Sequence, residues 1–215
     1  MTSSYPTTNK ETELPAINQI LSSVGQAPVT TLDQTNPDVA IAYDTLLQVS
    51  KEVQAEGWTF NTEFELEIQT DSNKEYIIPN NMLQVDLSPS NAGNIDVVRR
   101  TKPGETEPKL YDRYNHKWEI GNVANDTWKV DVVYWYNWVD IPQPVQNYIV
   151  SKASTITAQR IVGDGGLIQM LQQREALARA NAMEYECNQG DYSFFGRSQN
   201  GNHYSSYKPY TALQR

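Results

Sequence analysis

The segment from Val132 to Asp164 constrains the fold most, because it joins two kinds of structure. It reads VVYWYNWVDIPQPVQNYIVSKASTITAQRIVGD. An aromatic stretch with strand character runs through Pro142 and Pro144 into an apolar stripe at helical spacing. Proline cannot donate to a β ladder but is tolerated in the first turn of a helix. The chain is therefore expected to pass from β structure to α structure at this point.

Two helices are expected ahead of the strands. Apolar residues recur at helical spacing over residues 14–24, with Thr12 as the expected N-cap and Gly25 as the expected C′ residue. A second apolar stripe covers residues 39–53 and ends before the next glycine. Asn36 can cap this helix, because a proline and an aspartate follow it at the first helical positions.

From Trp58 onward the apolar period changes to two. Phe64, Leu66 and Ile68 alternate with acids, which predicts a strand with one solvated face. Further strands are expected at residues 76–78, 82–87, 95–100, 109–113, 117–120 and 128–138. The turn-rich linkers between them favour antiparallel hairpins in a small sheet, sandwich or barrel.

Two more helices are expected after the crossing, one running to the GDGG turn at 163–166 and one from about Leu167 to Cys187. The predicted fold is therefore α+β, a discontinuous four-helix base with an inserted antiparallel β domain and an irregular C-terminal tail. The expected boundaries are 1–60 and 140–190 for the helical domain, 61–139 for the β insertion and 191–215 for the tail. Such a plan places Trp58 and Phe60 near Trp138 and Ile141, where the two connections cross.

Composition excludes several functions. No apolar run is long enough to span a bilayer, and no secretory signal is seen, so the protein is expected to stay where it is made. The net charge of −9 lies almost wholly in residues 1–91 and would repel nucleic acid rather than recruit it. Cys187 is expected to be a small core residue, and neither His116 nor His203 has neighbours at metal-ligand spacing. No cofactor or metal is therefore expected.

Each set of candidate site residues can also be explained without a functional role. Glu63, Glu65 and Glu67 would lie on one strand face at a spacing a glycosidase could use, but a solvated face explains them better. The aromatic crossing, Tyr134, Trp135, Tyr136 and Trp138, could stack on sugars, although a core strand or subunit contact is favoured. A basic set in the insertion could meet an acidic partner surface, or could simply be solvated: Arg99, Arg100, Lys102, Lys109, Arg113 and Lys117.

The final residues are rich in aromatic side chains without any packing period. Burying these rings would not by itself offset the conformational entropy of ordering the segment. The tail is therefore expected to dock on another protein or a neighbouring subunit, with the alternative that it folds back or stays loose. The aromatic residues concerned are Tyr192, Phe194, Phe195, Tyr204, Tyr207 and Tyr210.

Four separated segments resemble the tail tubular protein A family of short-tailed bacteriophages. They are AINQILSSVGQAPVTTL (16–32), EVQAEGWTFNTE (52–63), DIPQPVQNYIVSKAS (140–154) and RANAMEYECNQGDYSFF (179–195). They cover nearly the whole chain in the right order, whereas the middle, roughly residues 70–125, resembles the family only in strand character.

The resemblance implies a structural adaptor ring, a dodecamer in the virion tail between the portal protein and the nozzle, tail tubular protein B. Double-stranded DNA would pass through its centre without sequence-specific binding. The helices would build the ring, and the β part would lie near the nozzle and the tail fibres. The protein would be made in the cytoplasm of the host bacterium. The alternative, from an activity suspected in some relatives, is a glycoside hydrolase acting on host capsule or exopolysaccharide.

Overall fold

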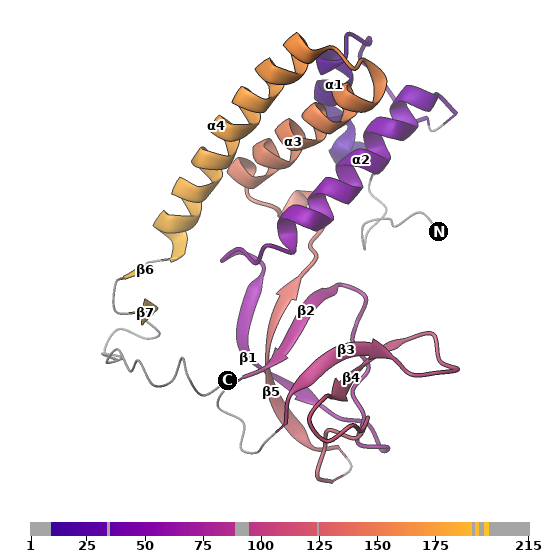
Figure 1. Ribbon diagram of the computed structural model, residues 1–215, viewed down its shortest axis with the longest axis vertical. Helices are drawn as coiled ribbons and strands as arrows, with labels where there is room; N and C mark the ends of the chain where they lie inside the picture. The colour runs from indigo at the N-terminus through magenta and orange to yellow at the C-terminus, as the bar shows by residue number, and fades with distance from the viewer. Residues whose placement is uncertain are drawn as a thin grey trace.

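The computed structural model describes residues 10–33, 35–88, 95–123, 125–190, 192–193 and 196–197. Its helices gather at one end and its main strands at the other, so the fold is α+β as expected (Figure 1). The chain enters the helical end, crosses to the strands and returns to the helical end (Figure 1).

The first helices follow their capping signals, with one exception. A short 3-10 helix, η1 (Lys10–Glu13), leads directly into α1 (Leu14–Ser23). Thr12 is therefore not the N-cap, because η1 already includes it, and Glu13 holds that position without a side-chain cap bond. At the other end Gly25 has φ +79°, and the Gln26 amide donates to the Leu21 carbonyl at 3.0 Å. This is a Schellman ending, as predicted for that glycine.

The second helix, α2 (Pro37–Gln54), begins as expected. The Asn36 side chain accepts a hydrogen bond from the Asp38 amide at 3.0 Å, and Pro37 holds the first helical position. The helix ends three residues before Gly57, which has φ +78°.

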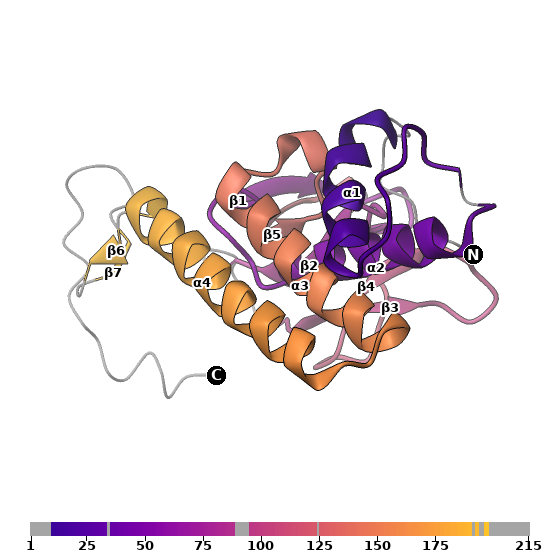
Figure 2. The same cartoon turned by 90° about the horizontal axis from the view of Figure 1, so that it is seen from above.

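The central helix is α3 (Gln143–Ile161), which starts immediately after Pro142. It packs against α1, α2 and α4 (Gly165–Gly190). Viewed from above, α3 lies between α4 on one side and the pair α1 and α2 on the other (Figure 2). The helical core lies around α3.

The strands are antiparallel and form small sheets. β1 (Thr62–Gln69), β5 (Thr127–Tyr134) and β2 (Met82–Leu87) pair in the order β1-β5-β2, while β3 (Val97–Thr101) pairs with β4 (Pro108–Asp112). A third pair joins the two-residue strands β6 (Tyr192–Ser193) and β7 (Gly196–Arg197). The first and last strands of the insertion are therefore partners.

Three predicted strands are shorter than expected. Residues 76–78 and 117–120 contribute only the isolated bridges from Ile77 to Lys109 and from Asp112 to Lys117. Pro79 follows the first of these and lacks a donor, which prevents a longer ladder. β5 stops at Tyr134, and the chain turns into a 3-10 helix, η2 (Trp138–Asp140), before α3.

The expected alternation along β1 is broken by a bulge. Glu63 pairs with Val132 and Leu66 with Val130, so β1 contains one extra residue between these pairs. Glu65 lies in the bulge with φ +54°. Because a slip of one residue exchanges the two faces of a strand, Glu63 shares a face with Leu66, whereas Glu67 lies on the opposite face. The prediction that Glu63, Glu65 and Glu67 share one face is wrong.

Two clusters of buried apolar residues lie at the two ends. The helical cluster includes Trp58, Trp138 and Ile141, with Phe60 packed at its edge, as the predicted crossing requires. The second cluster lies under the strands and includes Trp128 and Val130. The residue boundaries given for the domains stay a prediction.

Cys187 is exposed on α4, so its predicted place in the core is wrong; it lies one position beyond the buried stripe that ends at Glu186. Within the part of the chain that the structure describes, no helix is both long enough and apolar enough to cross a membrane.

Candidate interaction surfaces

A buried amide, Gln54, joins the helical end to the returning chain. Its side chain accepts from the Tyr136 amide at 2.8 Å and donates to the Tyr136 carbonyl at 3.2 Å. It also donates to Ser50 Oγ at 3.0 Å. The last turn of α2 is thereby fixed to the segment that follows β5.

Asn61 fixes the outgoing chain in the same way. It is fully buried, and its Oδ1 accepts from the Trp58 amide at 2.8 Å. Its Nδ2 donates to the carbonyls of Gln54 at 2.8 Å and Tyr134 at 2.7 Å. Every donor and acceptor of this buried side chain is therefore used, which is what a buried amide requires.

Glu186 attaches α4 to the same junction. Its carboxylate is buried and accepts from the Thr59 amide at 2.9 and 3.0 Å and from the Thr59 hydroxyl. Arg179 lies 3.7 Å from Glu56 and covers the ring of Tyr148 at 5.7 Å. Both connections to the β part and the end of α4 thus meet in one hydrogen-bonded region, which couples the two ends of the molecule.

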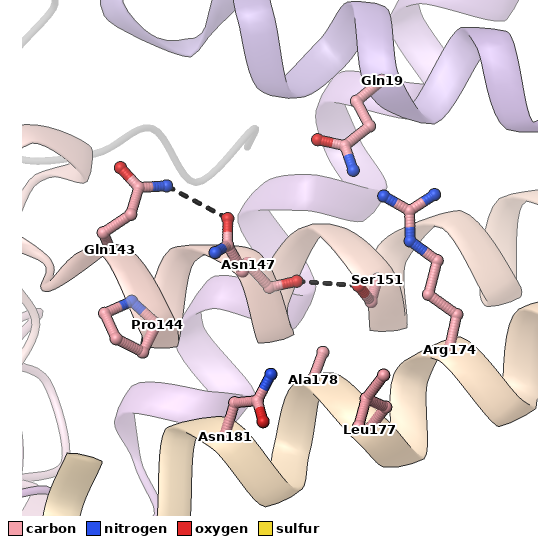
Figure 3. Close-up of a pocket in the computed structure, with 9 residues that line it drawn as sticks. All are labelled: Gln19, Gln143, Pro144, Asn147, Ser151, Arg174, Leu177, Ala178 and Asn181. Carbon is pink, nitrogen blue, oxygen red and sulfur yellow. Dashed lines mark hydrogen bonds between the residues drawn. The ribbon is translucent and has the colours of Figure 1, made fainter.

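A groove runs between α1, α3 and α4, and four of its nine lining residues carry side-chain amides (Figure 3). It has a volume of about 470 Å³. Gln143 donates to Asn147 at 3.0 Å, and Arg174 reaches from α4 toward Gln19 on α1 (Figure 3). Asn181 and Leu177 extend into the same space from α4 (Figure 3). Side chains of this kind can bind the backbone or polar side chains of another protein.

The surface of α4 that does not face α3 is little buried. Of its residues, only Leu171, Ala182 and Glu186 are buried among those whose side chains the structure describes. Met170 is 70% exposed and Leu177 is 64% exposed. Exposed apolar side chains in one row indicate a contact surface more than a water-facing helix.

The structure does not bring the predicted basic set together. On the β3–β4 hairpin Arg99 is opposite Leu110 and Arg100 is opposite Lys109, so neighbouring members leave opposite faces. Arg113 pairs with Asp96, and Arg99 donates to the Met82 carbonyl at 2.7 Å.

Two lysines of the basic set are neutralised locally. Lys109 is buried and lies 2.5 Å from Glu75 and 2.6 Å from Glu105, while Lys102 lies 2.6 Å from Glu75. Burial opposes ionisation of Glu75, but hydrogen bonds from Lys102 and Lys109 outweigh it and lower the pKa of this carboxyl. These lysines tie the hairpin to the preceding loop, whereas Lys117, like Arg99 and Arg100, is exposed and forms no ion pair with any described residue.

Arg100, another member of the basic set, contacts an aromatic ring on the outer face of the β3–β4 hairpin. The Arg100 guanidinium lies 4.6 Å from the centre of the Tyr111 ring, which meets Trp118 edge-on at 4.8 Å. A cation over an aromatic ring at this distance is attracted to it, so Arg100 is held along the hairpin.

The aromatic crossing is divided between the core and the surface. Trp135 and Trp138 are buried in the helical cluster. Tyr134 and Tyr136 are half-buried with ring centres 5.8 Å apart, and Phe60 lies 6.3 Å from Tyr136. The tryptophans therefore cannot offer a sugar-stacking platform, in agreement with the favoured core interpretation.

The acids of β1 do not form a facing pair. Glu65 lies 3.1 Å from Lys129, and its amide donates to Asp131 at 2.9 Å. Glu63 and Glu67 leave opposite faces of the sheet, as the register shows. A glycosidase needs two carboxyl groups on either side of one bond, and this strand does not arrange them so.

Several of the predicted site residues lie outside the described residues or close to their limits. Among the tail aromatics, Tyr192 belongs to β6, and Phe194, Phe195, Tyr204, Tyr207 and Tyr210 lie outside the described residues. His203 does too, and His116 is exposed in a turn with φ +55°. Within the described ranges no group of acids, histidines and cysteines could hold a metal ion.

Sequence reasoning missed the junction amides and the buried ion cluster. A signal was present for Gln54, because it follows Leu46 and Ser50 at steps of four on the buried side of α2. Asn61 and Glu75 carry no such periodic signal, since each lies in an irregular segment whose partners are distant in sequence.

The comparison with known families fits this geometry. A model described as "Tail tubular protein" matches residues 14–192, which include all four α-helices and the β part. No curated protein matches the chain. The match covers most of the sequence, so the chain belongs to the tail tubular protein family and is a structural component of a bacteriophage tail.

Proposed function

We propose that this chain is the A-type tail tubular protein, the adaptor whose ring joins the portal protein to the tail nozzle. The observation that carries the proposal is the junction of Gln54, Asn61 and Glu186, which firmly connects two ends with separate cores. An adaptor must hold one partner at each end and transmit force between them. A junction in which the side chains of Gln54, Asn61 and Glu186 are all hydrogen-bonded suits that task.

Each part of the chain has a role in this proposal. Residues 1–60 and 140–190 form the ring through contacts between copies. Residues 61–139 extend toward the nozzle, tail protein B, and the tail fibres, where Arg99, Arg100 and Lys117 are available at the surface. Residues 191–215 dock on the portal or a neighbouring copy through their aromatic side chains.

Charge supports a DNA channel. The chain has a net charge of −9, and acidic surfaces repel the phosphate backbone. A ring with such a lining lets double-stranded DNA slide through during ejection without sequence-specific contacts. No cofactor takes part in this function.

The test is assembly on the portal protein of the same phage. Electron microscopy of the purified mixture is expected to show a ring, twelve-fold symmetric, seated on one end of the portal. Sedimentation of the adaptor without portal gives the control, since a ring that closes only on its template leaves free monomers there. Compact monomers in the presence of portal protein would overturn the proposal.

A further inference from the structure

Two stripes, carried by helices on opposite sides of α3, have matching character. The α4 stripe consists of Met170, Arg174, Leu177 and Asn181, which are spaced four, three and four residues apart and so share one face. All four are exposed. Exposed positions from residue 169 to 188 are filled mainly by Gln, Asn, Ala, Met and Leu, and Arg174, Arg179 and Glu184 are the charged ones.

The α2 stripe consists of Ile41, Asp44, Gln48 and Glu52, spaced three, four and four residues apart. It is also exposed, and it has acids where the α4 stripe has a base. Arg174 and Asp44 form no ion pair with any residue that the structure describes, while Glu52 lies 3.4 Å from Lys152. Ile41 is an exposed aliphatic residue, 36% accessible, that faces away from its own core.

The position of the stripes suits a ring. α3 lies between α4 and α2, so the two helices that carry the stripes lie on opposite sides of α3 (Figure 2). A closed ring of identical subunits with head-to-tail contacts needs two unlike faces on each copy. Rows of side chains spaced by three and four residues interdigitate when two helices pack.

We propose that the α4 stripe of each copy packs against the α2 stripe of the next copy in the ring. Arg174 then meets Asp44, while Leu177 and Met170 on either side of it cover Ile41. The groove that Arg174, Leu177 and Asn181 help to line receives the polar side chains of α2. This inference rests on the proposed adaptor ring and names the surfaces that close it.

The test uses two variants that each lose one face. Arg174→Glu with Leu177→Glu removes the α4 face, and Ile41→Lys with Asp44→Lys removes the α2 face. Val123→Glu is the control, because Val123 is 60% exposed in the β part, away from both stripes. Each protein is mixed with the portal protein, cross-linked and resolved on a denaturing gel.

Wild type and the control should give a ladder of oligomers, and each face variant alone should give at least a tenfold loss of dimer. A mixture of the two face variants should restore the dimer band, because each variant retains the face that the other lacks. Dimers from the Ile41→Lys, Asp44→Lys variant alone would mean that α4 pairs with itself. Ladders from both variants would place the interface elsewhere. Either result overturns the inference while leaving the ring intact. No ladder from wild type would instead overturn the adaptor proposal and this inference with it.

Circular dichroism of each variant separates loss of the interface from loss of the fold. All four substituted side chains are exposed, so the fold should tolerate the changes. If a double variant unfolds, the single substitutions Leu177→Glu and Ile41→Lys replace it in the same assay, with the same outcomes.

Discussion

At the scale of single residues, buried polar side chains specify how the two ends of the molecule meet. Gln54 and Asn61 use their amide groups on backbone atoms of the returning chain, so a shift of one residue there would leave several buried groups without partners. Such a loss costs about 1 to 3 kcal/mol for each group. Apolar packing alone would tolerate the shift better, which gives these amides their role in specifying the fold.

Glu75 makes the stability of the β part depend on pH. Burial opposes ionisation of Glu75, but hydrogen bonds from Lys102 and Lys109 outweigh it, so its pKa in the folded protein lies below the ordinary value of 4.5. The unfolded chain therefore binds the proton more tightly. This stabilisation is present above about pH 4.5 and is lost as the pH falls through the folded pKa.

Glu75→Gln is expected to lower the free energy of unfolding at pH 7 by about 1 to 3 kcal/mol, because buried Lys109 loses one of its two carboxylate partners and keeps only Glu105. Urea titrations between pH 3 and 7 should show a weaker acid dependence in this variant than in wild type. Glu67→Gln is the matched control, since Glu67 is an exposed strand carboxylate, and it should change stability by less than about 0.5 kcal/mol. An unchanged acid dependence in Glu75→Gln would contradict the prediction.

At the scale of secondary structure, local signals predicted helices better than strands. Asn36 and Gly25 act through neighbours within a few residues, so the sequence alone reveals them. The bulge at Glu65 cannot be predicted in this way, because it is defined by pairing with β5, about 66 residues away, where Asp131 accepts from the Glu65 amide. The surfaces of the candidate site depend on the same long-range pairing, which is why the basic set looked like one patch in the sequence.

Gly57, between α2 and β1, tests a conformational requirement of one connection. Its φ is +78°, and an added Cβ would lie 3.5 Å from Val133 Cγ2 and 3.7 Å from Thr62 Oγ1, which are ordinary contacts. Gly57→Ala should therefore destabilise the protein through backbone strain alone, by about 1 to 2 kcal/mol. Gly165→Ala is the control, because that helical glycine has open space around its Cβ position, and it should be neutral or stabilise by up to about 1 kcal/mol. Equal urea midpoints for the two variants would show that the connection tolerates a side chain.

At the scale of the whole molecule, the helical end and the β end differ in the surfaces that they offer for contacts with other proteins. The helical end contains two exposed stripes, whereas the charged side chains of the β end are largely paired with each other. Contacts between copies are therefore expected at the helical end. In the proposed adaptor, binding to the nozzle then relies on shape and on the cations that form no ion pair with a described residue, Arg99, Arg100 and Lys117.

The role of the last residues is tested by a truncation after Gln189. This cut retains Glu186 and its hydrogen bonds to Thr59, so α4 stays attached to the junction and the helical signal in circular dichroism should be unchanged. Attachment to portal protein, measured by co-sedimentation, should be lost, because the proposed docking contacts are made by the removed aromatic residues. A full-length variant with Tyr204, Tyr207 and Tyr210 changed to Ser separates the rings from the backbone and should also fail to attach. Loss of the cooperative unfolding transition in the truncated protein would mean that the aromatic residues belong to the core, and retained attachment would place portal binding on the helices themselves.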